Sequence, residues 1–346
     1  MSDVQEIIEN YGLGNLIAVE KISSGLMHQT HRIKATSGVY FLQCLHPKLS
    51  SQEILDDYVR VTQHLQRKGF ESPRVIATRD GRFLVCDQSD RMWRLTSAVR
   101  GETFEKVTSC EQALEGACML GRFHVGMADF PHDFESNHPL HDTDGHLEKL
   151  TRVLSEESST DDSFGVHKAS VEIFSLIEQV RLPEDLPIRV VHGDPKISNI
   201  MFEDSKSVGM IDLDTCNRHS VLVDLGDAIR SWCRDGYEDE YQNFHLDRFD
   251  AIIKGYIRSG FRLTREEVRN IWRSGPLITL ELASRFARDV IEDEYFAFDE
   301  GKYESRKAHN VARMNSMLHL ARDMMRKRTS MESIVESNFA DLGEME

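Results

Sequence analysis

The chain has 346 residues, of which 40% are hydrophobic, and this is long enough for two domains with a core each. Its formal net charge is −16, from 42 Lys and Arg against 58 Asp and Glu, so neither nucleic acid nor an anionic membrane is an expected partner. No apolar run approaches the roughly 20 residues of a membrane span, and the polar start is unlike a signal peptide, which together favour a cytoplasmic protein.

The first part of the chain predicts a small antiparallel sheet with one long helix. Residues 3–10 favour a short helix, and residues 51–69 favour a longer one that begins after Ser51 and ends at Gly69. The strand candidates are short apolar or alternating stretches that end at turns: 16–22, 30–35, 39–45, 75–78 and 83–86, with a further strand at 93–96. We therefore expect residues 1–92 to form one lobe, a five-stranded sheet with a helix.

Residues 93–346 predict a second, mainly helical lobe. Apolar residues recur at helical spacing in six segments: 109–129, 169–180, 246–259, 264–274, 276–294 and 303–326. His124 lies on the apolar side of the first of these, and we expect it to be a core histidine with satisfied hydrogen bonds. Residues 131–162 are polar and rich in His and acidic residues, which predicts an exposed insert. The tail from Lys327 is polar and is expected to fray.

A polar loop between two apolar strands carries the strongest functional signal. The loop reads HGDPKISN from His192 to Asn199, and the hairpin after it ends at Asp212. This hairpin brings Asn199 next to Asp212, and carboxylate and amide oxygens held together suit Mg²⁺. Asp194 stays free to orient and deprotonate a hydroxyl group, with Lys196 two residues later. HGD alone is also compatible with an ordinary turn, but the whole spacing is typical of kinase-type phosphoryl transfer.

The cysteines and histidines predict neither disulfides nor a zinc site. No cysteine lies in a C-x-x-C pair, and the six are spread along the chain: Cys44, Cys86, Cys110, Cys118, Cys216 and Cys233. We expect buried, reduced thiols, as in a cytosolic protein. The 15 histidines come without an H-E-x-x-H motif, so zinc is not an expected cofactor.

HGDPKISN and the later IDLDT together resemble the catalytic segment of the aminoglycoside phosphotransferase and choline kinase superfamily. Similar stretches extend along the chain: 40–43, 59–65, 141–143, 211–215, 285–289 and 295–296. Within the superfamily, the chain looks most similar to the N-acetylhexosamine 1-kinase-like sugar kinases. The resemblance implies an α+β, two-lobe protein-kinase-like fold, with ATP and Mg²⁺ as cofactors and a small-molecule hydroxyl acceptor as partner.

The resemblance also implies roles for residues in and near the loop. Asp194 would orient the acceptor hydroxyl and take its proton, and Lys196 would neutralise charge on the moving phosphoryl group. Asp214 is expected in the metal shell or at the acceptor. Asp224 either fixes the catalytic loop through hydrogen bonds or caps a helix. Arg285 is expected to reach the acceptor or a phosphate, with a solvated helix face as the alternative.

Nucleotide-binding residues are implied in the first lobe and at its end. The turn at Ser24 and Gly25 lies where kinases cover the phosphates, although an ordinary hairpin turn explains it equally well. The third strand has Gln43 where kinases place Lys or Arg, so part of the usual electrostatic contact is missing. The segment with Met92 and Arg94 is expected to be the hinge between the lobes, with its backbone hydrogen-bonded to adenine.

The expected function is phosphorylation of a small-molecule hydroxyl by ATP. By resemblance, the acceptor is a sugar, such as an N-acetylhexosamine at its anomeric hydroxyl. Protein substrates are not expected. Control by phosphorylation of an activation segment is not expected either, because no D-F-G or A-P-E motif follows Asp212. One alternative is a choline, amino-alcohol or aminoglycoside-type antibiotic kinase, whose cationic acceptor would suit the acidic insert at 131–162. A further alternative is a nucleotide-binding pseudokinase, suggested by Gln43.

Overall fold

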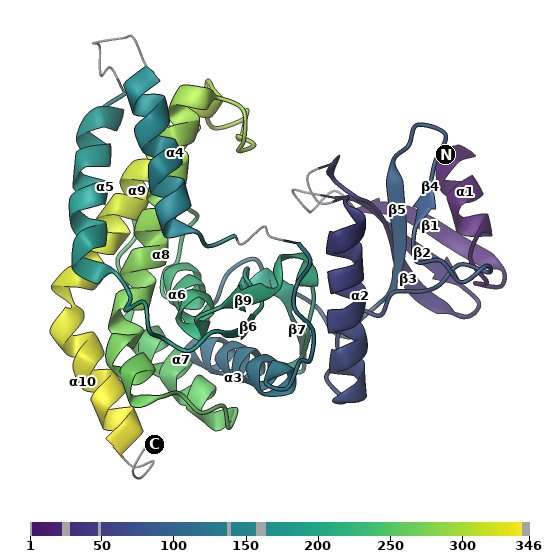
Figure 1. Ribbon diagram of the computed structural model, residues 1–346, viewed down its shortest axis with the longest axis horizontal. Helices are drawn as coiled ribbons and strands as arrows, with labels where there is room; N and C mark the ends of the chain where they lie inside the picture. Colours follow the sequence, from purple (N-terminus) through teal and green to yellow (C-terminus); the bar gives the residue numbers. More distant parts are fainter. Residues whose placement is uncertain (1, 23–27, 48–49, 137–139, 157–163, 341–346) are drawn as a thin grey trace.

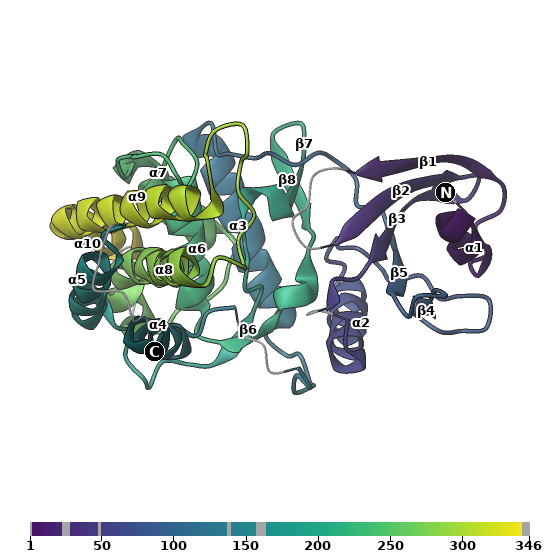
Figure 2. The same cartoon turned by 90° about the horizontal axis from the view of Figure 1, so that it is seen from above.

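A computed structural model describes residues 2–22, 28–47, 50–136, 140–156 and 164–340. It has two lobes, a smaller one built on a five-stranded antiparallel sheet and a larger, mainly helical one (Figure 1, Figure 2). The predicted α+β, two-lobe architecture is confirmed. The turn at Ser24 and Gly25, which we expected over the nucleotide phosphates, lies outside the described residues.

The sheet of the small lobe has the strand order β1-β2-β3-β5-β4. Its strands are β1 (Leu16–Ile22), β2 (Gln29–Ala35), β3 (Gly38–Cys44), β4 (Val85–Cys86) and β5 (Met92–Ser97). Alternate residues, among them Ile33, Leu42 and Leu95, are fully buried, and they form one core with α1 (Ser2–Glu9). Helix α2 (Gln52–Arg67) lies on the other side of the sheet, between it and the large lobe (Figure 1).

The sheet has five strands, as expected, and the strand predicted at 93–96 is one of them, but the strand predicted at 75–78 is not. The segment 75–78 contributes only an isolated bridge between Val75 and Thr96. The fifth strand is β5, which pairs with β3 on one side and with β4 on the other.

The expected hinge is therefore wrong, because Met92 and Arg94 lie inside β5. Trp93 and Leu95 alternate with them and are buried in the core of the small lobe, and Arg94 is buried on the opposite face of the strand. The carbonyl of Met92 accepts a hydrogen bond from the backbone N–H of Leu45 at 2.8 Å, so it is paired within the lobe. We infer that the boundary between the lobes lies after β5 and not at residue 92.

Helix α2 connects the sheet to the large lobe through its side chains. It begins as expected at Ser51, whose hydroxyl accepts a hydrogen bond from the N–H of Ile54. Asp57 is buried, and its carboxylate accepts hydrogen bonds from the backbone N–H groups of Glu135 and Ser136. The acidic residue of this helix therefore holds the chain segment that follows the first helix of the large lobe.

The large lobe combines helices with two short strand pairs. Its helices are α3 (Cys110–Met127), α4 (Thr143–Glu156), α5 (Val166–Val180), α6 (Val221–Trp232), α7 (Leu246–Arg258), α8 (Arg265–Glu292), α9 (Arg306–Arg326) and α10 (Arg328–Phe339). Its strands are β6 (Arg189–Val191), paired with β9 (Asn217–His219), and β7 (Ile200–Glu203), paired with β8 (Lys206–Met210). All six cysteines are free, and Cys44, Cys118, Cys216 and Cys233 are buried as expected, whereas Cys86 is exposed and Cys110 is half-buried. No helix in the described ranges is long and apolar enough to cross a membrane.

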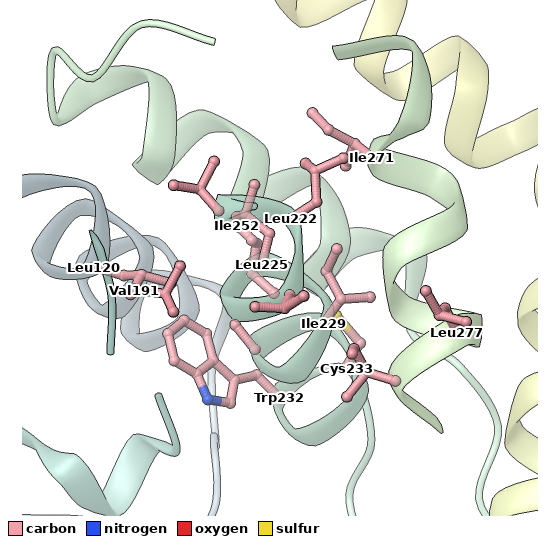
Figure 3. Close-up of a cluster of buried hydrophobic side chains, with 14 of the residues drawn as sticks. Leu120, Val191, Leu222, Leu225, Ile229, Trp232, Cys233, Ile252, Ile271 and Leu277 are labelled. Carbon is pink, nitrogen blue, oxygen red and sulfur yellow. The ribbon is translucent and has the colours of Figure 1, made fainter. Parts of the chain in front are cut away.

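Helix α6 is the central element of the large lobe. Figure 3 shows its Leu222, Leu225 and Ile229 among side chains from surrounding elements, which include Leu120, Val191, Ile252, Ile271 and Leu277. Nearly every residue of α6 is buried, so the helix is covered on all sides. Gly226 permits the close contact with α8, since a Cβ there would lie 2.5 Å from the carbonyl oxygen of Ser274.

Two helices expected at 264–274 and 276–294 are one continuous helix, α8, which runs through Pro276. A proline inside a helix removes one backbone hydrogen bond and usually ends or kinks it. Helix α8 packs against α4, α5, α6 and α9, and the apolar surface buried by these contacts offsets that loss.

Two segments expected to be exposed form helices instead. The polar insert at 131–162 contains α4, and the tail after Lys327 contains α10. Both expectations were wrong because each segment carries a narrow apolar stripe at helical spacing. The buried residues are Leu147, Leu150 and Val153 in α4, and Met331, Val335 and Phe339 in α10.

The small lobe is connected to the β7–β8 hairpin by backbone hydrogen bonds at two points. The chain leaving the small lobe pairs with β7, where Glu102 and Phe202 exchange two hydrogen bonds of 2.8 Å. The chain that follows α2 contacts β8, where the N–H of Met210 donates to the carbonyl of Glu71 at 3.2 Å. Each strand of the hairpin is thus joined to a segment that enters or leaves the small lobe.

The close contact between α6 and α8 gives a testable prediction. Replacing Gly226 by Ala forces a methyl group against a helix backbone that cannot move aside, and we expect a loss of stability of about 1–3 kcal/mol. Urea unfolding followed by circular dichroism measures it. The control is Gly126→Ala in α3, where the added Cβ would have an ordinary 3.5 Å contact with Leu65. Equal stability of both variants would contradict this account of the contact.

Candidate active site

The β7–β8 hairpin brings Asn199 and Asp212 together, as the sequence predicts. Strand β7 begins directly after Asn199, and its first residue is paired with the last residue of β8. The backbone N–H of Ile211 donates to the carbonyl of Asn199 at 2.9 Å. The side-chain amide of Asn199 donates to the backbone carbonyl of Asp194 at 2.9 Å, which leaves its Oδ1 as a candidate metal ligand.

Asp194 and Lys196 form an ion pair within the loop. The Lys196 Nζ lies 2.9 Å from Oδ2 of Asp194. The Asp194 side chain is 14% exposed and that of Lys196 is 44% exposed, so both remain accessible. Burial opposes the charge on Lys196, but the Asp194 carboxylate outweighs it and raises the pKa of the ammonium group. Lys196 therefore carries a positive charge beside the proposed proton acceptor at neutral pH.

Asp224, at the start of α6, fixes the catalytic loop, which is one of its two expected roles. Its carboxylate is fully buried and accepts hydrogen bonds from the backbone N–H groups of His192 and Gly193 at 2.7 and 2.9 Å. It also accepts one from His124 Nε2 at 2.9 Å. His124 Nδ1 lies 2.7 Å from the hydroxyl of Tyr256, so His124 is the satisfied core histidine that we expected.

The pKa of Asp224 and the shape of the loop follow from these contacts. Burial would raise the pKa of the Asp224 carboxyl, but the hydrogen bond from His124 and the nearby His192 lower it overall. Gly193 has φ +85°, and a Cβ there would lie 2.4 Å from the carbonyl oxygen of Thr215. Only glycine fits this position, so the sharp turn before Asp194 requires the G of the HGD sequence.

Asp212 has a strained backbone in a negatively charged environment. Its φ of 63° and ψ of 58° are left-handed, a conformation that costs of order 1–3 kcal/mol outside glycine. The carbonyl of the preceding Ile211 accepts a hydrogen bond from His192 Nε2 at 3.0 Å. The surrounding protein and the carboxylates of Asp214 and Asp194 raise the pKa of Asp212. A cation would relieve this crowding of negative charge.

The residues at the end of the hairpin fit a divalent cation that is shared with a substrate. Within the described ranges, no group of three or more His, Cys, Asp and Glu side chains is arranged to hold a metal by itself. Asn199 and Asp212 offer oxygen ligands, which Mg²⁺ prefers. Mg²⁺ usually takes one or two protein ligands and completes its shell with water and phosphate oxygens, so a pair of ligands is sufficient here.

A buried ion pair between the lobes is the main feature that the sequence analysis missed. The guanidinium of Arg94 donates two hydrogen bonds to Asp214, at 2.6 and 2.5 Å, and the two side chains are 1% and 3% exposed. Arg94 Nε donates to Oε1 of Gln43 at 2.9 Å, and the ring of Tyr58 lies 3.9 Å from the guanidinium carbon. Burial would raise the pKa of Asp214, but Arg94 and the nearby His28 hold it well below its usual value.

Other predicted site residues lie in places that we did not expect. Both carboxylate oxygens of Asp214 are bonded to Arg94, so they are engaged away from an acceptor or metal. The guanidinium of Arg285 lies over the rings of Tyr295 and Phe296, at 5.9 and 5.7 Å from their centroids. The contacts that the structure shows for Arg285 therefore do not bring it to the catalytic loop.

A second group of charges, centred on the buried Arg230, was also missed. Arg230 donates to Asp227 at 2.8 Å and to Glu238 at 3.0 Å. Both of these carboxylates help to raise the pKa of Lys196, so they lie near it. Arg234 follows, with a guanidinium nitrogen 3.9 Å from Glu238. The signal in the sequence was charge at Asp227 and Arg230, three residues apart on a mostly apolar helix, with Arg234 just beyond its end.

Some polar atoms in this group are buried without a hydrogen-bond partner among the described residues. They are Oδ2 of Asp227, Nε and Nη1 of Arg234, and Nε2 of His141. The other ring nitrogen of His141 lies 2.9 Å from a carboxylate oxygen of Glu281. Buried polar groups in proteins normally have partners, so these atoms are candidates for hydrogen bonds to water or to a bound polar molecule.

Comparison with known proteins identifies relatives of the chain. Residues 18–252 match the phosphotransferase enzyme family, APH. A homoserine kinase of Brucella anthropi is 24% identical over 262 residues, which are 74% of this chain and 76% of that protein. The relatives of this kind include a homoserine kinase of Neisseria meningitidis serogroup B, 25% identical over 67% of this chain and 72% of that protein. The closer likeness to N-acetylhexosamine 1-kinases that the sequence suggested stays a prediction.

Solved kinases share the fold. The microcompartment-associated aminopropanol kinase has a TM-score of 0.67 at 16% identity and covers 96% of this chain and 98% of its own. Amicoumacin kinase hAmiN, solved with AMP-PNP, Ca²⁺ and Ami, has a TM-score of 0.64 at 15% identity, with 91% and 92% covered. These likenesses confirm the predicted kinase-like fold. Because the family match spans more than half of its length, the chain belongs to the phosphotransferase enzyme family.

Proposed function

We propose that the chain transfers the γ-phosphoryl group of ATP to a hydroxyl group of a small polar molecule, with Mg²⁺ as the metal. The observation that carries the proposal is the arrangement of Asp194, Asn199 and Asp212 around one hairpin. A pseudokinase would not need all three residues. The full set therefore favours catalysis over nucleotide binding alone.

Each residue of the site has a distinct role in the proposed phosphoryl transfer. Asp194 orients the acceptor hydroxyl and takes its proton as transfer proceeds. Lys196, held 2.9 Å from Asp194, places a positive charge beside the transferring group. Asn199 and Asp212 would hold Mg²⁺, and the metal when bound neutralises charge on the phosphates. Asp224 keeps the loop in place through the backbone of His192 and Gly193.

A sugar is the first candidate acceptor, because the sequence resembles sugar 1-kinases and because the unpartnered atoms near Lys196 include both donors and an acceptor. A sugar hydroxyl both donates and accepts hydrogen bonds, so it suits Oδ2 of Asp227 as well as the nitrogens of Arg234 and His141. A hydroxy amino acid is the second candidate. Its ammonium group would suit Asp227, its carboxylate would suit Arg234, and the similarity to homoserine kinases favours it.

A coupled assay of ADP release with a panel of acceptors tests the function. The panel contains N-acetylhexosamines, homoserine, aminopropanol, choline and aminoglycosides. We expect acceptor-dependent ADP release that requires Mg²⁺, with the highest kcat/KM for an N-acetylhexosamine. Homoserine as the best acceptor would select the second candidate. No acceptor-dependent turnover in the presence of tight Mg·ATP binding would support the pseudokinase alternative.

Replacing Asp194 by Asn tests the proposed proton acceptor. We expect kcat to fall by about 10²–10⁴-fold, the range for a lost acid–base group, while the affinity for Mg·ATP stays nearly unchanged. Steady-state kinetics and calorimetry measure the two quantities. Asp204→Asn, in the exposed turn of the same hairpin, is the matched control and should behave like wild type. A kcat within tenfold of wild type would exclude this role for Asp194.

Replacing Asn199 or Asp212 by Ala tests the metal site. Both variants should bind the nucleotide more weakly in Mg²⁺, and Asp212→Ala should be the more severe because it also removes a charge. Calorimetry with ADP in Mg²⁺ and in EDTA separates the metal from the nucleotide. We expect the variants to differ from wild type only when Mg²⁺ is present. Equal Mg²⁺-dependent binding in all three proteins would place the metal elsewhere.

A further inference from the structure

Gln43 contacts an arginine of the neighbouring strand. Protein kinases place a phosphate-binding Lys on β3, and this chain has Gln43 on that strand. The residue directly opposite it on β5 is Arg94. The Oε1 of Gln43 accepts a hydrogen bond of 2.9 Å from Nε of Arg94, so the amide of Gln43 fixes the near edge of the guanidinium.

Arg94 is held from three sides and is nearly inaccessible. Its two terminal nitrogens bond to the two carboxylate oxygens of Asp214 in the large lobe. The ring of Tyr58 on α2 covers its face at 3.9 Å. Only 1% of its side chain is exposed. Because its nitrogens already donate to Gln43 and Asp214, Arg94 cannot bind a phosphate group without breaking the ion pair. Any effect of Arg94 on nucleotide binding must therefore act through Asp214.

Asp214 lies two residues after the strained Asp212. The 3₁₀ turn η3 (Leu213–Thr215) starts directly after Asp212, and Asp214 is its middle residue. On the other side of Asp212, the carbonyl of Ile211 is bonded to His192. Hydrogen bonds therefore hold the chain on both sides of the left-handed Asp212. His192 holds the preceding Ile211, and Arg94 holds the following Asp214. Strained residues persist only where their surroundings determine them in this way.

We propose that Gln43 and Arg94 are positioning residues for Asp212. Gln43 sets the plane of the guanidinium, Arg94 holds Asp214, and Asp214 holds the chain that presents Asp212 to the metal. This inference rests on the proposed function and deepens it. Gln43 then acts as a hydrogen-bond acceptor for Arg94, and it is not a neutral substitute for a phosphate-binding Lys.

The two roles of Gln43 predict opposite effects for Gln43→Glu. A Glu at position 43 still accepts a hydrogen bond from Arg94, so a positioning role survives. The same Glu would repel a phosphate, so a direct contact with the nucleotide would be lost. Gln43→Ala removes the acceptor and impairs both roles. A purely structural role would change stability and leave nucleotide affinity at its wild-type value.

The experiment measures the Kd of Mg·AMP-PNP by calorimetry. We expect Gln43→Ala to weaken binding about three- to tenfold, the range for one neutral hydrogen bond, and Gln43→Glu to weaken it less. Gln63→Ala, an exposed glutamine of α2, is the matched control. Thermal melting confirms that each variant is folded. Binding by Gln43→Glu that is weaker than by Gln43→Ala would overturn the proposal.

A double-mutant cycle asks whether Gln43 acts through Arg94. In an Arg94→Met background, Gln43→Ala should cause no further loss of affinity for Mg·AMP-PNP. If Arg94→Met does not fold, an Arg94→Lys background serves the same purpose. A loss as large as in the wild-type background would overturn the proposal. The proposed function and the positioning role of Gln43 and Arg94 are contradicted by different results. A wild-type chain that does not bind Mg·AMP-PNP contradicts the proposed function itself, whereas the comparisons above are decided only in a chain that binds it.

Discussion

The arrangement of the two lobes around the site depends on the buried ion pair between Arg94 and Asp214. Removing two charges from water costs several kcal/mol per ion, and the pair is favourable only if every hydrogen bond is made. Here the two terminal nitrogens of Arg94 donate to both carboxylate oxygens of Asp214, and its Nε donates to Gln43. The ring of Tyr58 covers the face of the guanidinium. The pair therefore allows few alternative positions of one lobe against the other. It also places a fixed positive charge beside the cluster of carboxylates at Asp212.

Neighbouring turns of helix α6 carry the residue that holds the catalytic loop and a residue of the charged group around Arg230. Asp224, in its first turn, holds the backbone of the catalytic loop, and Asp227, one turn later, lies among the charges near Lys196. Most of the rest of the helix is apolar and covered on all sides, so both acidic residues are fixed by the packing of the large lobe. The residue that holds the catalytic loop and a residue of the proposed acceptor site thus lie on one rigid element.

Local patterns predicted the elements whose partners are close in sequence. The hairpin turn brought Asn199 to Asp212, and helical spacing gave most helices to within a few residues. Arg94 was misplaced because its partner Asp214 is 120 residues away, and no local period reveals such a contact. Helix α10 was missed because only Met331, Val335 and Phe339 mark its buried face, and three apolar residues in a polar segment are a weak helical pattern. The group of charges around Arg230 was missed because the partners of charged residues on a buried helix are known only once the helix is packed.

The hydrogen bonds that join the small lobe to the β7–β8 hairpin have a mechanical consequence. Glu102 holds one strand of the hairpin, and the carbonyl of Glu71 holds the other. A rigid rotation of the small lobe that preserves both contacts must have its axis close to them. Points near a rotation axis move least, and the ends of this hairpin carry Asn199 and Asp212. A small rotation of this kind, within the freedom that the Arg94–Asp214 ion pair leaves, would therefore move the candidate metal-binding oxygens of Asn199 and Asp212 very little.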